Sequence, residues 1–186
     1  MKREIRVIGI DDAAFDKFSQ EKTRIFGVVF RGGLFVEGVL SSEVDVDGGN
    51  ATRVISEMIL KSHFLPQLRA ILLDGIAVAG FNLIDIHELN KRTGIPVIVV
   101  MRRLPKTDDM KDALKKLGME DKISLLEKAG RIARAGKVFI QFAGIGESEA
   151  AEIVSLTATR SFIPEPLRVA HLIAQGFSLG ESRGAA

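Results

Sequence analysis

The sequence feature that says most about the fold is the segment at residues 71–75 (Ile-Leu-Leu-Asp-Gly). It is a short apolar run that ends abruptly in a carboxylate and a glycine. Such runs are typical of strands buried on both faces of a parallel sheet. A second apolar run, residues 5–10, ends in Asp11 and Asp12. Ligands bind beyond the carboxyl ends of strands in open α/β sheets, so Asp11 and Asp74 lie where a site is expected. The alternative is that each aspartate only begins a turn.

The composition limits which kind of site the chain can build. Its 186 residues fit one domain over residues 1–186, with residues 181–186 as a frayed tail. Cysteine is absent, which excludes disulfides, a thiol nucleophile and a cysteine-based zinc site. Carboxylate ligands favour Mg²⁺ or Mn²⁺. No apolar run approaches the ~20 residues that cross a bilayer, and we expect a cytoplasmic protein with no membrane partner. The net charge of +2 means that nucleic-acid binding needs a local basic patch.

The order of predicted elements indicates the fold class. Three strands form an antiparallel meander, and the hydrophobic period then changes to that of alternating helices and strands. This order is that of a ribonuclease-H-like α/β domain: a mixed sheet in which the meander is followed by parallel βα units, with helices on both faces. The first strand then lies beside the fourth, which brings Asp11 and Asp74 to one edge. We expect strands at 4–10, 25–30, 34–46, 69–74, 95–101 and 137–142, and helices at 51–61, 81–92, 108–117, 120–134, 147–158 and 167–176.

Several motifs together resemble those of a known family. The chain reads Gly-Ile-Asp-Asp at 9–12, Val-Asp-Gly at 46–48, Leu-Asp-Gly-Ile at 73–76 and Pro-Glu-Pro-Leu-Arg-Val-Ala-His at 164–171. This combination resembles an archaeal endonuclease dU family, a distant relative of endonuclease V, over essentially the whole chain. The resemblance implies a metal-dependent endonuclease that cuts DNA carrying deaminated bases, deoxyuridine in particular, during DNA repair.

The resemblance also implies which residues carry the chemistry. Asp11 and Asp74 match the two aspartates at the strand ends of endonuclease V, as metal ligands and catalytic residues. The third carboxylate is either Asp47, at the break between strand and helix, or Glu57 inside the next helix. Asp47 has the alternative of capping that helix. Two divalent ions held by such carboxylates support phosphodiester hydrolysis.

Later residues complete the predicted site. His171 is the candidate catalytic histidine, although a histidine in an apolar helix is also a common core residue. Arg168 would share its helix face and hold a phosphate, or would be a surface charge. Arg102, Arg103 and Lys106 follow a strand at the same edge as Asp74, so they are candidates for positioning the DNA backbone. The alternative for these three is a solvated loop.

Base recognition is the least determined feature. Phe81 and Asn82 follow Asp74 closely and are candidate base-pocket residues, because a flipped base is read by stacking and hydrogen bonds. Phe81 could instead pack the next helix onto the sheet. The chain has no tyrosine, so it lacks the Pro-Tyr wedge of endonuclease V. The alternatives to an endonuclease are a nucleic-acid-binding protein of the same fold without cleavage and an interaction domain with an empty metal site.

Overall fold

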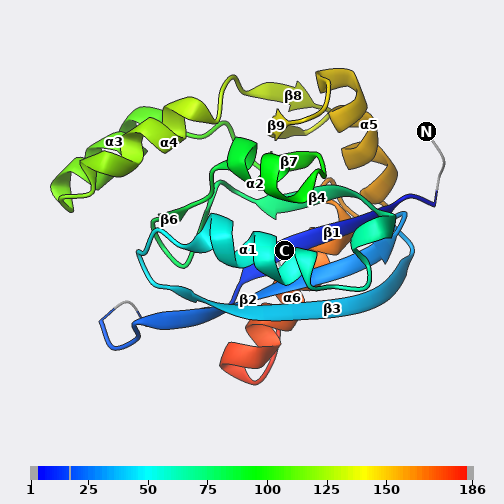
Figure 1. Ribbon diagram of the computed structural model, residues 1–186, viewed down its shortest axis with the longest axis horizontal. Helices are drawn as coiled ribbons and strands as arrows, with labels where there is room; N and C mark the ends of the chain where they lie inside the picture. The colour runs from blue at the N-terminus through cyan, green and yellow to red at the C-terminus, as the bar shows by residue number, and fades with distance from the viewer. Residues whose placement is uncertain (1–3, 17, 184–186) are drawn as a thin grey trace.

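A computed structural model describes residues 4–16 and 18–183, in which one seven-stranded sheet and one two-stranded hairpin are found (Figure 1). The order across the large sheet is β3-β2-β1-β4-β7-β9-β8, and β5 pairs with β6. The strands are β1 (Arg6–Asp12), β2 (Lys22–Arg31), β3 (Phe35–Asp45), β4 (Leu68–Asp74), β5 (Ala77–Val78), β6 (Asn82–Leu83), β7 (Val97–Met101), β8 (Ala133–Ala135) and β9 (Val138–Ala143). The helices are α1 (Ala51–Leu60), η1 (Leu65–Gln67), α2 (Ile86–Thr93), α3 (Thr107–Lys116), η2 (Glu120–Lys122), α4 (Ile123–Lys128), α5 (Glu147–Thr157) and α6 (Glu165–Leu179).

The pairing of strands confirms the ribonuclease-H-like, endonuclease V-like fold. The strands β1, β2 and β3 form the antiparallel meander, and β4 lies parallel to β1 on its other side. The strand β7 is parallel to β4, whereas β9 is antiparallel to β7. In register, Leu73 lies opposite Ile10, so the next residues, Asp74 and Asp11, lie at the same edge of the sheet.

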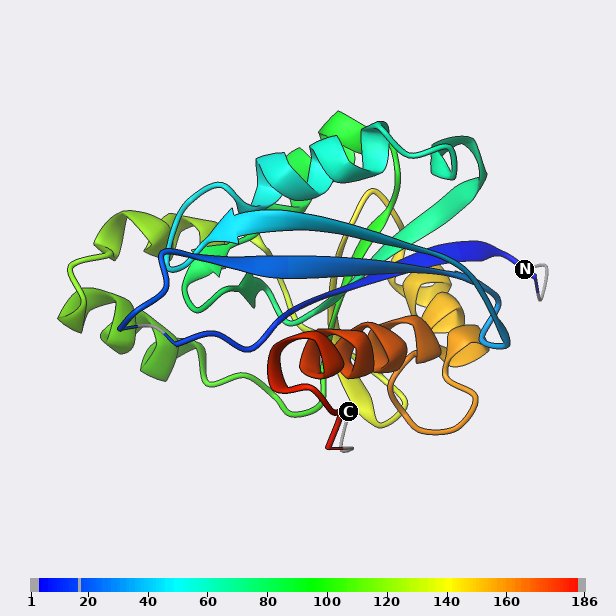
Figure 2. The ribbon, with the colours of Figure 1, turned by 90° about the horizontal axis from the view of Figure 1, so that it is seen from below.

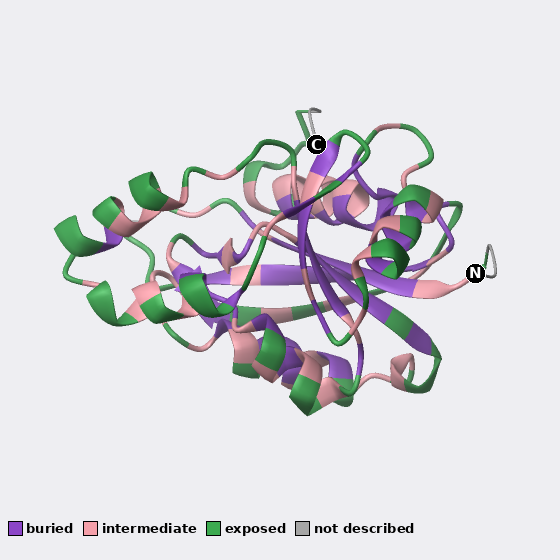
Figure 3. Cartoon of the chain, turned by 90° about the horizontal axis from the view of Figure 1, so that it is seen from above, coloured by how far each residue is buried: buried purple, intermediate pink, exposed green. Residues whose placement is uncertain are grey.

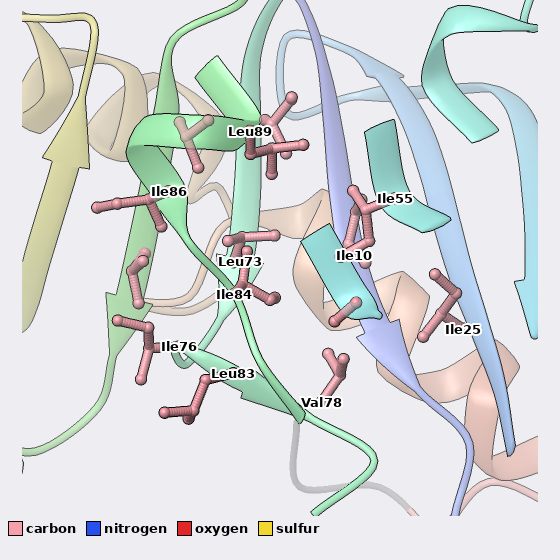
Figure 4. Close-up of a cluster of buried hydrophobic side chains, with 14 of the residues drawn as sticks. Ile10, Ile25, Ile55, Leu73, Ile76, Val78, Leu83, Ile84, Ile86 and Leu89 are labelled. Atoms are coloured by element: carbon pink, nitrogen blue, oxygen red, sulfur yellow. The ribbon is translucent and has the colours of Figure 1, made fainter. Parts of the chain in front are cut away.

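Helices cover both faces of the sheet, which is why the central strands read as continuous apolar runs. The helices α1 and α2 lie on one face, and α5 and α6 lie on the other (Figure 2). The central strands between them are largely buried (Figure 3). Successive residues of β4 serve different cores, because side chains alternate across a strand. Leu73 packs with Ile55 and Leu89 under the first pair of helices (Figure 4), and Leu72 packs with Leu167 under the second.

Two predicted helices are corrected by the structure. The helix predicted at 81–92 begins at Ile86, because Asp85 caps it by accepting hydrogen bonds from the backbone of the first turn, and the preceding residues form β6. The helix predicted at 120–134 ends with α4 at Lys128. Gly130 then takes a left-handed backbone with φ of 80°, and residues 133–135 become β8, which pairs with β9.

The C-terminal helix α6 leads into the predicted frayed tail. Residues 184–186 of that tail lie outside the described residues. Residues 181–183 have no regular secondary structure, but the backbone N–H of Arg183 donates to the side chain of Gln175 at 3.0 Å. Among the described residues, even the longest helix, α6 with 15 residues, falls short of a membrane span.

Candidate metal centre

Asp11, Asp74 and His171 come together at one edge of the sheet. Asp11 lies near the end of β1, Asp74 ends β4, and His171 projects from α6. One ligand atom from each residue lies within 4.8 Å of the other two. The structure thus brings together both aspartates predicted as metal ligands and the predicted histidine, from three elements far apart in sequence.

A glycine in β1 lets α6 approach closely enough to deliver His171. A Cβ atom at Gly9 would lie only 2.4 Å from the backbone carbonyl carbon of Pro166 and 2.6 Å from the backbone nitrogen of Leu167. The first turn of α6 therefore rests directly on the backbone of β1. His171 follows Pro166 by little more than one turn, and Asp11 follows Gly9 by two residues along the strand, so the two side chains meet.

The hydrogen bonds of His171 define its tautomer. The Nδ1 atom lies 2.8 Å from Oδ2 of Asp11, and Nε2 lies 2.9 Å from the side-chain nitrogen of Gln175. Because Gln175 accepts a bond from Arg183 through its oxygen, its NH₂ group faces the imidazole and donates. His171 Nε2 is then the acceptor, and Nδ1–H donates to Asp11.

The two aspartates are held where their negative charge is unfavourable. Burial, together with the charges of Asp74 and Asp12, raises the pKa of Asp11 to about 6, against the opposing effect of the hydrogen bond from His171. Burial also raises the pKa of Asp74, while the positive charge of Arg102 opposes the rise. A cation between the carboxylates would remove the repulsion. Oxygen donors of this kind fit Mg²⁺ or Mn²⁺, whereas a cation bound to His171 would replace one of its two hydrogen bonds.

The predicted third carboxylate is engaged elsewhere. Oδ1 of Asp47 accepts a hydrogen bond from the backbone N–H of Phe81 at 2.7 Å, and Asp47 has a left-handed backbone with φ of 53°. Asp47 is not part of the cluster of metal-ligand candidates, and the N-cap position of α1 belongs to Asn50. Glu57 pairs with Arg53 on the exposed surface of α1, at 3.1 Å. His171 is therefore the third member of the cluster.

Asp12 has a structural role beside the cluster. Its Oδ2 accepts a hydrogen bond from the backbone N–H of Ala79 at 3.0 Å, and the carbonyl of Ala79 accepts one from Asp47 N–H at 2.8 Å. Asp12 and Asp47 thereby both hold the turn of the β5–β6 hairpin at Ala79.

The predicted phosphate contacts fall into two groups. Arg102 is exposed, and its positive charge opposes the rise in the pKa of Asp74, so it lies near that carboxylate. Arg103 and Lys106 are exposed and follow on the same segment, although Lys106 also pairs with Asp109 at 3.6 Å. Arg168 differs, because its guanidinium donates from two nitrogens to the buried carboxylate of Glu165, at 2.9 and 2.7 Å.

The two predicted base-pocket residues, Phe81 and Asn82, both have structural contacts. Asn82 is fully buried, and its side chain accepts from the backbone N–H of Ala51 and donates to the carbonyl of Asp45 and the side chain of Asn50. It therefore fixes the start of α1 and presents no polar atom to a ligand. Phe81 is half-buried and packs against the hydrophobic core, which agrees with its alternative interpretation.

Gln175 is the residue that the sequence interpretation missed. It lies four positions after His171 on α6, and this spacing places two helical side chains on one face. The spacing was readable in the sequence, but the partner of the amide oxygen, Arg183, was not.

Comparison with known proteins places this chain in a family. The order of strands in its mixed sheet is the endonuclease V-like arrangement. The chain belongs to the endonuclease dU family, whose signature matches residues 3–178. A UPF0215 protein of Methanothermobacter thermautotrophicus is 51% identical over 191 residues, covering 100% of this chain and 94% of the relative. One from Thermococcus sibiricus is 45% identical, covering 98% and 97%.

Solved structures support the fold. A protein of unknown function from Archaeoglobus fulgidus superposes with a TM-score of 0.86 and 41% identity, covering 92% of this chain and 96% of that one. Human endonuclease V gives a TM-score of 0.62 at 20% identity, covering 95% and 85%. Endonuclease V of Ciona intestinalis was solved in complex with DNA containing an inosine followed by a ribo-adenosine. It gives a TM-score of 0.58 at 16% identity, covering 95% of this chain and 85% of that one.

Proposed function

We propose that the protein is a metal-dependent endonuclease that cuts DNA carrying deaminated bases, deoxyuridine in particular, as a step of DNA repair. The cluster of Asp11, Asp74 and His171 at the carboxyl edge of the sheet is the observation that carries this proposal. Membership of the endonuclease dU family supports nuclease activity on DNA, and the Ciona relative was solved with a deaminated base in its DNA.

The carboxylates of Asp11 and Asp74 would hold Mg²⁺ or Mn²⁺. Such an ion supplies positive charge where a phosphodiester gains negative charge during hydrolysis. The residues themselves contribute orientation. His171 donates its Nδ1 proton to Oδ2 of Asp11 and fixes that carboxylate, and Gln175 fixes the imidazole in turn. Hydrogen bonds of this outer kind keep ligand atoms in place.

Exposed cations would position the DNA backbone. Arg102 lies beside Asp74 and would bind a phosphate oxygen next to the carboxylates, with Arg103 and Lys106 extending the contact along the strand. Exchanging these three residues for glutamine should weaken DNA binding and flatten its dependence on salt, because fewer counterions are then released. The binding measurement can be made on undamaged DNA, independently of cleavage.

A second candidate function is binding of nucleic acid without cleavage. The engagement of Asp47 with the backbone of Phe81 favours it, because the cluster then has two carboxylates instead of three. The basic segment after β7 would serve either function.

One experiment separates the two functions. Oligonucleotides containing uracil, hypoxanthine or undamaged bases are incubated with the protein, with Mg²⁺, Mn²⁺ or chelator. We expect metal-dependent cutting of the uracil strand, which Asp11→Ala and Asp74→Ala abolish while binding of DNA persists. Exposed Asp121→Ala, in η2, is the matched control. Equal survival of all strands with wild-type protein and metal would refute the endonuclease and leave the binding function.

A further inference from the structure

A cavity opens near the candidate metal centre, beginning two residues after Asp11. It has a volume of about 620 Å³ and lies between residues 13–16, the start of β2 and the last turn of α6. The helix α6 runs along β1 and β2 on this face of the sheet (Figure 2). Neither the predicted base-pocket residues, Phe81 and Asn82, nor the basic segment after β7 contributes to its lining.

A short series of contacts connects this cavity to Asp11. Asp11 lies directly opposite Phe26 in the pairing of β1 with β2, so both side chains point to the same face. The ring of Phe26 packs edge-on against that of Phe177 from α6, with the centroids 5.4 Å apart. One cross-strand step and one ring contact place Phe177 on the order of 10 Å from Asp11. A nucleic-acid strand advances about 3.4 Å per stacked nucleotide, so the cavity lies within about three nucleotides of the carboxylates.

The cavity presents an aromatic face beneath a cation. Phe177 is 61% exposed, which is unusual for so large an apolar side chain. The guanidinium carbon of Arg24 lies 5.8 Å from the centre of its ring, and Glu43 holds that guanidinium at 3.5 Å. Lys22 and Asp16 also line the cavity, so its two cations are balanced by two carboxylates. A balanced lining suits an uncharged aromatic group better than a phosphate.

We propose that this cavity holds a nucleobase of the bound single strand of DNA, stacked on the exposed part of the Phe177 ring next to Arg24. The inference rests on the proposed function, because it places the scissile phosphate at Asp11 and Asp74. Stacking on aromatic rings with support from arginine is how many proteins hold single strands, and it accepts any base.

The lining reads no particular base. Thr23 donates to the carbonyl of Ala13, Ser178 donates to that of Ala174, and the side-chain oxygen of Gln20 accepts from the backbone of Asp16. These hydrogen bonds engage the hydroxyls of Thr23 and Ser178 and the amide oxygen of Gln20, so stacking is expected to dominate. The cavity therefore binds a nucleobase that neighbours the damaged base in the strand, and it binds undamaged strands as well.

The test measures binding of a fluorescent, undamaged thymidine oligonucleotide in the presence of Mg²⁺. Phe177→Ala should weaken binding about five- to hundredfold, the range for one stacked base, without changing the salt slope. Phe177→Trp keeps an aromatic face and should bind the oligonucleotide about as tightly as the wild type. The matched control is Phe162→Ala, because Phe162 is 57% exposed and has Lys137 Nζ 3.9 Å from its ring centre, yet lines a different cavity beside β8. Thermal unfolding verifies that each variant is folded.

The outcomes separate this proposal from the proposed function. Wild-type affinity in Phe177→Ala, an equal loss in Phe162→Ala, or no binding of the strand by the wild type would overturn the cavity assignment, and none of these outcomes concerns cleavage of uracil. A selective loss in Phe177→Ala, together with no cutting of any strand, would support the cavity and refute the endonuclease. If a loss in Phe177→Ala reflected misfolding, Phe177→Leu would settle the question, because it keeps the apolar contact with Phe26 and lacks the aromatic face. Retained affinity in Phe177→Leu would overturn the proposal.

Discussion

Gly9 in β1 and Pro166 in α6 meet backbone to backbone, so closely that a Cβ atom on the glycine would lie 2.4 Å from the carbonyl carbon of the proline. This contact sets the height of α6 above the sheet. Since His171 and Asp11 are carried by these same two elements and bond at 2.8 Å, the geometry of the candidate metal centre depends on the absence of one side chain.

Gly9→Ala should therefore damage stability and activity together. Its methyl group meets backbone atoms, which cannot rotate away, so α6 must move. Overpacking a core typically costs about 1–3 kcal/mol, and this site should lie at the upper end of that range. Urea unfolding measures the loss. Gly49→Ala is the control, because nothing lies within 4 Å of a Cβ there. Equal stability of the two variants would show that the close contact between Gly9 and Pro166 leaves room for a methyl group.

A second prediction concerns Gln175. Replacing it with alanine removes the donor to Nε2 of His171, so the imidazole proton can exchange between the two nitrogens and Asp11 loses its fixed partner. Nitrogen NMR of His171 should show mainly the Nδ1–H tautomer in the wild type and a mixture in Gln175→Ala. Cleavage should fall about ten- to hundredfold, as for other outer partners of metal ligands. Gln67→Ala, at an exposed position in η1, should change neither the tautomer of His171 nor the rate of cleavage. An unchanged NMR spectrum in Gln175→Ala would refute the role.

Much of this arrangement was predictable from the sequence. The apolar run at 71–73 specifies a strand buried on both faces, and the similar run at 5–10 specifies its neighbour, which together place Asp11 and Asp74 at one edge. The position of Asp47 was not predictable in this way. It depends on a left-handed backbone at that residue and on a bond to Phe81, 34 positions away. Strands of two residues, such as β5 and β6, are too short to show a hydrophobic period.

The pKa of Asp11 gives a third prediction. In metal-free protein, folding raises the pKa of Asp11 from 3.8 to about 6. Between pH 3.8 and about pH 6 the folded state therefore binds more protons than the unfolded state. Stability therefore falls as the pH rises through this window, and the ionised carboxylate costs about 3 kcal/mol above it. Asp11→Asn should be more stable than the wild type at pH 7.5 in chelator and should have a flatter pH profile.

The same variant tests the metal. Mn²⁺ should raise the unfolding temperature of the wild type, because it binds only the folded state, and should raise that of Asp11→Asn much less. The exposed substitution Asp121→Asn should behave like the wild type in both measurements. If Asp11→Asn proves less stable than the wild type in chelator at pH 7.5, the ionised carboxylate of Asp11 does not destabilise the folded state as its raised pKa implies.

The last prediction concerns the helices that follow β7. Lys122, the last residue of η2, donates to three backbone carbonyls, those of Asp47 at 2.6 Å, Gly48 at 2.8 Å and Phe81 at 2.9 Å. These bonds tie the helical segment to the loop that precedes α1 and to the β5–β6 hairpin. Hydrogen bonds to a charged group contribute about 1.5–3 kcal/mol each when buried, and partial exposure reduces this contribution.

Lys122→Met keeps much of the apolar stem and removes the three donors, leaving the carbonyls without this partner. We expect a loss of about 2 kcal/mol in the free energy of unfolding. We also expect faster amide hydrogen exchange at α3, α4 and the hairpin, while β1 and β4 stay protected, because local opening follows the contacts that are lost. The control is Lys116→Met, at an exposed position on α3. If exchange increases equally across the whole sheet, Lys122 stabilises the fold as a unit and does not anchor the helical segment to the hairpin.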